Sequence, residues 1–282
     1  MKKFKTLLIL SLIIMMTSCG SSNGSLPNGE VSVSTPTSIT SNYSGTYYNS
    51  VDFNLTKADL KTALFNVISK NTTSLSYSAL WSAFKDTDAK SDGTVWDMYS
   101  NTRWTFSTNQ CGNYQGEGSC YNREHSIPKS WFKEASPMYT DLFHLYPTDG
   151  YVNSKRSNYP FGEVKSASYT SKNGSKLGSS SHSLYSGTVF EPIDEYKGDF
   201  ARTYFYFATR YQDKTINLSE GSKVFVSASY PKLTNYAIDL FKKWSKNDPV
   251  SQKEINRNNA VYKKQKNRNP FIDYPLLEDK IW

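Results

Sequence analysis

The sequence predicts a mixed α+β domain in which helices predominate. Apolar and aromatic residues recur at helical spacing in several segments, which is typical of helices that bury one face. Between these segments, residues 166–187 contain nine serines and the turn pair Asn173-Gly174, a composition that favours an exposed hairpin or loop. From Tyr43 onward aromatic residues are frequent, and residues 43–282 fit one domain, because single domains of about 200 to 250 residues are ordinary.

Five helices can be placed from start signals and apolar spacing. Thr56 with Asp59 forms a capping-box pattern ahead of the first, and Ser251 with Glu254 forms one ahead of the last. The apolar stripes of the first four, which we expect to face the core, are Leu60, Ala63, Leu64, Val67 and Ile68; Tyr77, Leu80, Trp81 and Phe84; Phe200, Tyr204, Phe207, Ala208 and Tyr211; and Leu233, Tyr236, Ala237, Leu240, Phe241 and Trp244. The last helix ends in a basic block, residues 263–268, which is either a solvated helix end or a phosphate-binding segment.

The first 18 residues predict a secretion signal of the lipoprotein type. Three lysines precede an apolar run from Leu7 to Met16, which is shorter than the roughly 20 apolar residues that a membrane span needs. Thr17-Ser18 directly before Cys19 suits a lipoprotein signal peptidase, so Cys19 would become the lipidated first residue. The alternative is an ordinary cleaved signal with an incidental cysteine. Both predict export, either as a membrane-anchored lipoprotein of the periplasm or cell surface or as a secreted protein.

Residues 19–42 predict a flexible tether. They consist mainly of Ser, Thr, Asn, Gly and Pro, which bury too little apolar surface to offset the entropy of ordering. Removal of residues 1–18 takes away three lysines and no acid, so the net charge falls from +8 to +5, with 30 Lys and Arg against 25 Asp and Glu. A charge of this size helps to recruit a polyanion, but it is equally common in proteins that bind none.

Two cysteines remain in the predicted domain. Cys111 and Cys120 flank a loop rich in Gly and polar residues. In an oxidising compartment we expect them to form a disulfide, which would stabilise a loop of this length by roughly 2 to 3 kcal/mol. Ligation of a metal by the two thiols is the alternative, but the sequence lacks CxxC spacing and a second thiol pair.

The segments Asn122–Pro128 and Val152–Asn158 predict a one-metal site for phosphodiester hydrolysis. Neutral imidazole is a suitable base near its usual pKa of about 6.5, so His125 would deprotonate the attacking water. Glu124 would supply one anionic oxygen to a divalent cation and Asn153 a neutral one. A site with so few protein ligands keeps several waters, as Mg²⁺ prefers, and Ca²⁺ or Mn²⁺ are alternatives. A lone His is more often a buried structural residue, and a lone Asn a turn residue.

Several cations accompany these residues and are candidates for binding phosphate. Taken singly, each is more often a surface charge. As a set they fit a groove that follows a nucleic-acid backbone, which gives affinity without sequence preference. The candidates are Arg123, Lys129, Lys155, Arg156 and Arg202.

Four segments together resemble the bacterial endonuclease I family of secreted or periplasmic nucleases. They read NREHSIP, DLFHLYPTDGYVNSKRSNYPFGEV, FEPIDEYKGDFAR and NRNPFIDYP, and the resemblance extends from about Tyr43 to the C-terminus. It implies a ββα-metal (His-Me finger) motif in an α+β domain, and an endonuclease that cuts DNA and RNA with little sequence preference and leaves 5′-phosphate ends. It also implies that His125 is the general base and that Glu124 and Asn153 hold Mg²⁺ or a similar dication.

The chain departs from the family pattern at two places. The family commonly has His where this chain has Phe143, while His144, which we expect to support the geometry of the site, is retained. Some members place a transition-state arginine between the base and the Asn, but residues 127–152 contain no Arg, so that role would fall to Arg156 or Arg202. Glu191 is acidic and family-like, and is either a supporting or a structural residue.

Two other classes of function remain alternatives. A surface lipoprotein that binds nucleic acid without cutting it would have no need of a general base. A zinc peptidase would need paired histidines one helical turn apart, which Glu124-His125 does not supply. His182 lies in the serine-rich segment, where no catalytic role is indicated. We expect a monomer with DNA and RNA as substrates and a membrane contact through lipidated Cys19.

Overall fold

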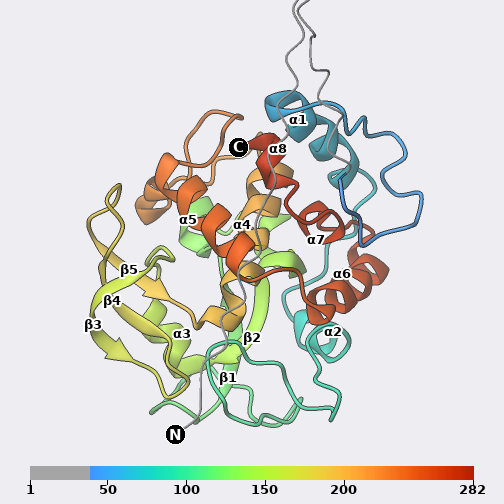
Figure 1. Cartoon of the computed structure of the whole chain (residues 1–282). Helices are drawn as coiled ribbons and strands as arrows, with labels where there is room; N and C mark the ends of the chain where they lie inside the picture. Colours follow the sequence, from blue (N-terminus) through green and yellow to red (C-terminus); the bar gives the residue numbers. More distant parts are fainter. Residues whose placement is uncertain (1–38) are drawn as a thin grey trace, which may run out of the picture. The chain divides into compact units, whose positions relative to one another are not determined.

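Two small antiparallel sheets and eight helices make up residues 39–282, the part of the chain that the computed structural model describes (Figure 1). The predicted α+β class is therefore confirmed. The strands are β1 (Tyr121–His125), β2 (Leu145–Asp149), β3 (Val164–Thr170), β4 (Lys176–Ser180) and β5 (Thr188–Glu191). The helices are α1 (Lys57–Ile68), α2 (Leu80–Thr87), α3 (Gly150–Arg156), α4 (Lys197–Arg210), α5 (Asn235–Asn247), α6 (Gln252–Gln265), α7 (Pro270–Asp273) and α8 (Glu278–Ile281).

The first sheet is a strand pair that leads directly into a helix. β1 runs antiparallel to β2, with His125 opposite Leu145. α3 begins at Gly150, the residue after β2, and packs against both strands. The Asp149 side chain caps α3 by accepting hydrogen bonds from two backbone N–H groups of its first turn, at 2.9 and 3.0 Å. This order of strand, strand and helix is the ββα motif that the family resemblance implied.

The second sheet contains the predicted hairpin. β3 and β4 pair antiparallel around Asn173-Gly174, and β5 adds to β4 on the other side. Gly174 has a φ of +102°, a conformation that glycine adopts without strain, and its N–H donates to the Ser171 carbonyl at 3.0 Å. Tyr169 of β3 packs edge-on against Tyr151 of α3, so this sheet lies beside the ββα motif (Figure 1).

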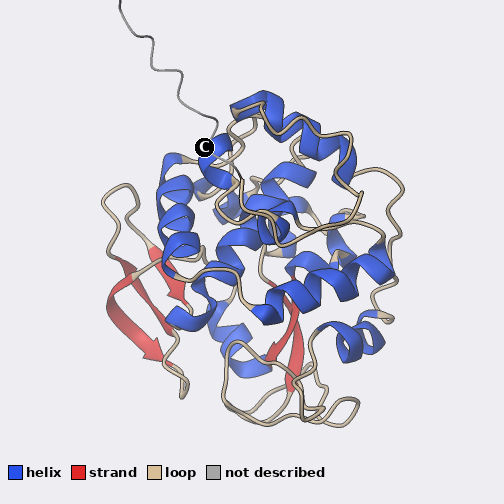
Figure 2. Cartoon of the chain, turned by 45° about the vertical axis from the view of Figure 1, so that its right-hand side comes forward, coloured by secondary structure: helices blue, strands red, loops and turns tan. Residues whose placement is uncertain are grey.

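α4 forms the centre of the hydrophobic core. Every residue from Gly198 to Arg210 is buried, and the helix contacts α1, α5 and α7. Figure 2 shows the helices crowded together, with the larger sheet at one edge of them and the smaller one between helices. The predicted stripe of Phe200, Tyr204 and their neighbours is therefore confirmed as core, and the same helix also buries the charged residues Arg202 and Arg210.

Two helix starts and one predicted capping box differ from the prediction. The capping box at Thr56 is wrong, because the Thr56 side chain makes no capping hydrogen bond and Lys57 has a φ of 52°. α2 begins at Leu80, so Tyr77 precedes it, and α5 begins at Asn235, so Leu233 precedes it. The capping box of α6 is confirmed by reciprocal bonds between Ser251 and Glu254.

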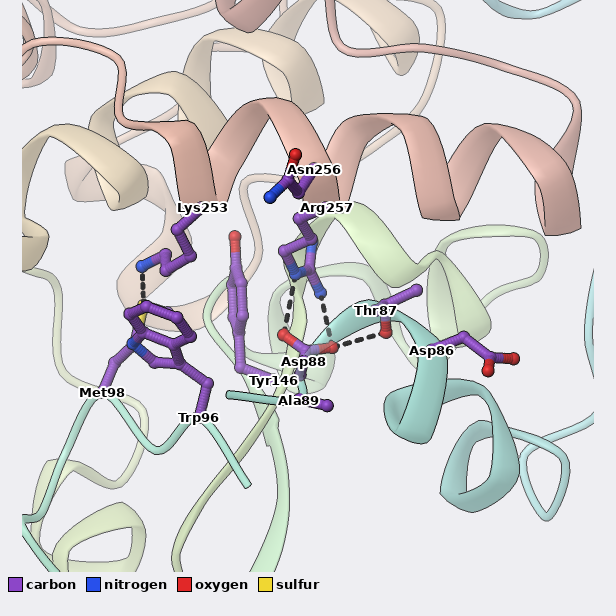
Figure 3. A pocket seen from close by; sticks show the side chains of 10 residues that line it. All are labelled: Asp86, Thr87, Asp88, Ala89, Trp96, Met98, Tyr146, Lys253, Asn256 and Arg257. Atoms are coloured by element: carbon purple, nitrogen blue, oxygen red, sulfur yellow. Dashed lines mark hydrogen bonds and ion pairs between the residues drawn. The ribbon is translucent and has the colours of Figure 1, made fainter. Parts of the chain in front are cut away.

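A charged network under α6 fixes the start of β2 (Figure 3). Arg257 on α6 donates from Nε to Asp88 at 2.8 Å and from Nη2 to the carbonyls of Leu142 and Leu145, both at 2.8 Å. Its guanidinium lies 4.3 Å from the ring centroid of Tyr146, and a cavity of about 90 Å³ lies beside the pair. This buried arginine holds the strand that faces the candidate catalytic residues.

The basic block at the end of α6 is divided between the core and the surface. Lys264 forms an ion pair with Asp86 at 2.6 Å. Arg268 is buried and donates a hydrogen bond to each carboxylate oxygen of Asp273, both at 2.7 Å. Lys263 and Lys266 are exposed. The block is therefore partly structural, because one of its cations supports α7.

The predicted signal peptide and Cys19 lie outside the described residues. Ser41 and Asn42, at the end of the predicted tether, rest against α7, where the Asn42 N–H donates to the Asp273 carbonyl at 2.7 Å. Within residues 39–282, no helix is long and apolar enough to cross a membrane.

Candidate active site

A cleft of about 240 Å³ opens over the end of β1 and the start of the loop after α3. It brings together the predicted base and both predicted metal ligands with three of the predicted phosphate-binding cations. Its lining residues are Tyr77, Asn122, Arg123, Glu124, His125, Pro128, Lys129, Asn153, Arg156, Ser157 and Asn158. Residues more than 20 positions apart in the sequence thus meet because α3 folds back on β1.

Glu124 and His125 reach the same cleft although they are neighbours on a strand. Residues on a regular strand alternate between its faces. β1 ends at His125, and beyond it the backbone turns around the Arg156 guanidinium, which binds the carbonyls of His125 and Ser126 at 2.9 and 2.5 Å. The end of the strand therefore lets both side chains serve one site.

The His125 ring is held in the tautomer that a general base needs. Its Nε2 lies 2.9 Å from the Tyr139 carbonyl oxygen, which can only accept, so Nε2 carries the proton and Nδ1 keeps its lone pair. The ring stacks on Tyr139 and Tyr77, at interplanar angles of 18° and 17°. Burial, together with the nearby His144 ring, lowers the pKa of His125 to about 3. The imidazole is therefore neutral near pH 7.

Only one oxygen of the Glu124 carboxylate is engaged. Oε1 accepts from the Tyr99 hydroxyl and from Nη1 of Arg156, both at 2.9 Å. Among residues 39–282, no side-chain donor makes a hydrogen bond to Oε2, and the His125 backbone N–H also favours the ionised carboxylate. Burial raises the pKa of Glu124 to about 7, while Arg156 and the Tyr99 hydroxyl favour the ionised form. Oε2 is thus the oxygen that Glu124 leaves open at the cleft.

The donor set fits a hard divalent cation. Asn153 projects from α3 into the cleft, and its side-chain amide makes no hydrogen bond to another described residue. The described part of the chain contains no group of three or more His, Cys, Asp and Glu arranged to hold a metal. A cation here would take Oε2 of Glu124 and the amide oxygen of Asn153 and complete its shell with water, which suits Mg²⁺.

The predicted phosphate-binding cations differ in their placement. Arg123 lies 3.7 Å from the Tyr77 ring centroid and 4.4 Å from that of Trp81, and donates to the Tyr77 carbonyl at 2.8 Å. Lys129 is half exposed at the mouth of the cleft and pairs with Glu134 at 2.7 Å. Lys155 lies outside the cleft lining, 5.0 Å from the Tyr151 ring centroid.

The two arginines predicted to stabilise the transition state are both engaged elsewhere. Arg202 is 1% exposed and makes two hydrogen bonds to Glu254, at 2.6 and 2.8 Å, and it does not line the cleft. The structure therefore does not place Arg202 at the site, because its charge is neutralised inside the helical core. Arg156 does line the cleft, but its guanidinium binds Glu124 and the backbone after β1.

Comparison with known proteins identifies the family. The model of the endonuclease I family matches residues 56–276. The chain belongs to the endonuclease I family. It is 38% identical over 234 residues to an extracellular ribonuclease of Bacillus amyloliquefaciens, covering 79% of this chain and 73% of the relative. It is 36% identical over 248 residues to an extracellular ribonuclease of Bacillus subtilis strain 168, covering 84% and 78%. An endonuclease-1 of Buchnera aphidicola subsp. Baizongia pistaciae is 29% identical over 133 residues, covering 47% and 46%.

This endonuclease I family member is therefore a nuclease, a hydrolase of phosphodiester bonds.

The predicted supporting residue His144 is buried behind the base. Its ring centroid lies 5.4 Å from that of His125, and its Nε2 lies 2.6 Å from the Met138 carbonyl oxygen. Phe143 is buried against Tyr206. Glu191 lies at the edge of the second sheet, where it accepts from the Val164 N–H at 2.8 Å and from Lys197 at 2.7 Å. Glu191 therefore supports the sheet.

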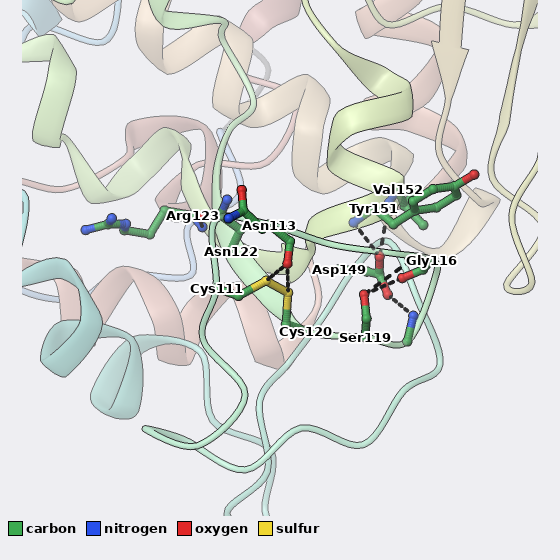
Figure 4. The surroundings of a disulfide bond; sticks show 11 residues. Cys111, Asn113, Gly116, Ser119, Cys120, Asn122, Arg123, Asp149, Tyr151 and Val152 are labelled. Atoms are coloured by element: carbon green, nitrogen blue, oxygen red, sulfur yellow. Dashed lines mark hydrogen bonds between the residues drawn. A yellow bond between two sulfur atoms is a disulfide. The ribbon is translucent and has the colours of Figure 1, made fainter.

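The predicted disulfide between Cys111 and Cys120 is present just before β1 (Figure 4). Inside the loop that it closes, the Gly118 N–H donates to Oδ2 of Asp149 at 2.7 Å. Asp149 also caps α3 through Oδ1. The disulfide loop is thus attached to the helix that carries Asn153.

Three tyrosines at the candidate active site of this nuclease were not predicted from the sequence. Tyr77 was expected in a core stripe but stacks on His125, and Tyr139 supplies the carbonyl that orients the base. No pattern in the sequence indicates a role for Tyr99, because its hydroxyl contacts Glu124, which lies 25 positions away in the sequence.

Proposed function

We propose that this nuclease is an exported, divalent-metal-dependent endonuclease that hydrolyses RNA and DNA with little sequence preference and leaves 5′-phosphate ends. The observation that carries the proposal is that the side chains of His125, Glu124 and Asn153 line one cleft. Two relatives that match most of this chain are named extracellular ribonucleases, which supports export and RNA as a substrate. Lipidation of Cys19 remains a prediction of the sequence.

The residues of the cleft divide the chemistry between them. His125 accepts a proton at Nδ1 from the attacking water, and the Tyr139 carbonyl keeps Nε2 as the protonated nitrogen. Arg123 and Lys129 bind phosphate oxygens at the mouth of the cleft. Arg123 also takes the place of the missing transition-state arginine, because it lines the cleft and pairs with no carboxylate, whereas Arg156 and Arg202 are each paired with a glutamate. When bound by Glu124 and Asn153, a divalent cation supplies positive charge against the charge that develops on the phosphate.

The test is cleavage of a plasmid and of an RNA by the full chain purified after export, with Mg²⁺ or with EDTA. His125→Ala should lower the cleavage rate by about 10²- to 10⁴-fold, because it removes only the base, and should leave binding of RNA in a shift assay largely intact. The matched control is His182→Ala, because that histidine lies outside the cleft, near Asp239.

Each outcome separates the candidate functions. Metal-dependent cutting that is lost in His125→Ala and kept in His182→Ala supports the proposal. Retention of RNA without cutting by the unmutated chain would instead favour a surface protein that binds nucleic acid. Cutting at a normal rate by His125→Ala would remove this residue from the mechanism.

A further inference from the structure

Two donors converge on a single oxygen of Glu124. The Tyr99 hydroxyl and Nη1 of Arg156 each lie 2.9 Å from Oε1, although a carboxylate offers two oxygens with about four acceptor positions. Glu124 is 2% exposed as a residue, but Oε2 is not among the fully enclosed side-chain atoms that lack a hydrogen-bond partner, so it opens onto the cleft. Oε2, which accepts from no side chain among the described residues, is therefore the oxygen that a ligand in the cleft would meet.

Tyr99 is fixed in place by contacts on every side. It is fully buried, and its ring packs against Phe190 and Phe200, with centroid distances of 5.0 and 5.9 Å. Its backbone N–H donates to Oδ1 of Asp97 at 2.7 Å. The hydroxyl can therefore hold the carboxylate in one orientation without help from a substrate.

Asp97 attaches this segment to the ββα motif. Oδ2 of Asp97 accepts from the backbone N–H of Asp149 at 3.0 Å, from the Trp104 indole N–H at 2.9 Å and from the Ser100 hydroxyl at 2.6 Å. Because Asp149 ends β2 and caps α3, the chain around Tyr99 is held in register with the helix that carries Asn153. One framework thus positions both expected metal ligands.

We propose that Tyr99 is a positioning residue for the metal site, in which its hydroxyl and the Arg156 guanidinium occupy Oε1 of Glu124 and so present Oε2 to a divalent cation. The proposal rests on the proposed function, since it assumes that Glu124 ligates the cation. Tyr99 does not line the cleft, so it acts only through Glu124. Partners of this kind behind a metal ligand change metal affinity by about 10- to 100-fold when they are removed.

The test is the substitution Tyr99→Phe, which removes the hydroxyl and keeps the buried ring. Direct binding of Mn²⁺, measured by the electron paramagnetic resonance signal of the free ion, gives a readout that does not depend on cleavage. We expect the Kd of the Mn²⁺ site that Glu124→Gln abolishes to rise at least about 10-fold. Cleavage should recover toward the unmutated rate at saturating Mn²⁺, which damage to the fold alone would not allow.

The matched control is Tyr146→Phe. Tyr146 is buried, packs against the same Phe200, and lies opposite Glu124 across the strand pair, but its hydroxyl bonds to Thr203. The substitution Tyr146→Phe should therefore leave the Mn²⁺ Kd unchanged. Arg156→Lys, which alters the second donor to Oε1, should raise the Mn²⁺ Kd as Tyr99→Phe does. It keeps the proposal testable if Tyr99→Phe folds poorly.

Failure of the inference and failure of the proposed function give different results. If the unmutated chain binds Mn²⁺ through Glu124 and cuts RNA, but Tyr99→Phe keeps the same Kd, only the positioning role is overturned. If the unmutated chain neither binds Mn²⁺ through Glu124 nor cuts, both the metal site and the role of Tyr99 are overturned.

Discussion

Two buried arginines illustrate how one residue type takes different parts in this nuclease. Arg156 and Arg202 are each 1% exposed and each is paired with a glutamate. The partner of Arg156 is Glu124, whose other oxygen is available at the cleft, whereas the partner of Arg202 is Glu254, which is part of the capping box of α6. The first pair therefore shapes the site, and the second joins α4 to α6.

Arg202→Met should destabilise the fold and leave the chemistry unchanged. The substitution leaves Glu254 buried without its cation, which typically costs about 3 to 5 kcal/mol of unfolding free energy. Urea unfolding measures the loss, and the cleavage rate per folded molecule should equal that of the unmutated chain. The double variant Arg202→Met/Glu254→Met, which removes both charges, should recover part of the stability. An Arg202 variant with unchanged stability and slow cleavage would return this residue to the active site.

The predicted site residues that the structure brings into one cleft are those that lie close together in short segments of the sequence. Glu124 and His125 are adjacent and Asn153 lies in a second short segment, so their residue types alone indicated a metal site and a base. Arg202 could not be distinguished from a phosphate-binding residue, because nothing in the sequence shows that α6 returns Glu254 to it. The role of Tyr99 is a contact across the fold and leaves no local pattern.

At the scale of the element, two helix starts with similar sequences behave differently. Thr56 and Ser251 each precede a helix and each has an acidic residue three positions later. The Ser251 hydroxyl accepts from the Glu254 N–H at 3.3 Å and Glu254 binds back to the Ser251 N–H at 2.9 Å. The Thr56 side chain makes no such bond, and Lys57, the first residue of the helix, has a positive φ. The Asp59 side chain is one methylene shorter than Glu, which disfavours the return bond to the Thr56 N–H.

Ser251→Ala should therefore cost more stability than Thr56→Ala. Loss of a capping hydroxyl typically lowers the unfolding free energy by about 1 kcal/mol, whereas removal of an unbonded side chain should change it by less than about 0.5 kcal/mol. Chemical denaturation of both variants under the same conditions measures the difference. Equal losses would show that the hydroxyl bond at Ser251 adds nothing beyond the helix propensity of the residue.

Strands were harder to predict than helices for a physical reason. The β3–β4 hairpin was indicated by its turn pair, because a Gly at positive φ is a local requirement. β2 is buried along its whole length and contains Pro147, so it lacks the alternation that marks a half-exposed strand. Its pairing with β1 depends on the long-range network of Arg257, which no local pattern reveals.

At the scale of the whole molecule, the core encloses charges as well as aromatic rings. Lys61 lies within the apolar stripe of α1 but is fully buried, and its ammonium donates to the side-chain carbonyl of Gln212 at 2.8 Å and to the Ser229 carbonyl at 2.7 Å. Lys232 is also buried nearby and binds the Lys214 carbonyl at 2.7 Å. Both side chains bind neutral oxygens, and the charge of Asp213 acts on Lys232, whereas Lys61 has only the like charge of Lys232 nearby.

This arrangement predicts that stability rises with pH above neutrality. Burial, with a smaller effect of Lys232, lowers the pKa of Lys61 to about 7, against a usual value of 10.5. Between these values the unfolded chain binds a proton that the folded chain does not, so the free energy of unfolding increases as the pH rises through this window. From pH 7 to pH 9 the gain from Lys61 should be about 2 kcal/mol, since one pKa unit corresponds to about 1.4 kcal/mol. Urea unfolding at both pH values measures this gain in unfolding free energy.

The substitution Lys61→Met, which fills the site without a charge, should remove the part of the gain that comes from Lys61. The control Lys57→Met, at an exposed position, should retain the whole gain. An equal rise in Lys61→Met would mean that Lys61 enters the fold with its proton.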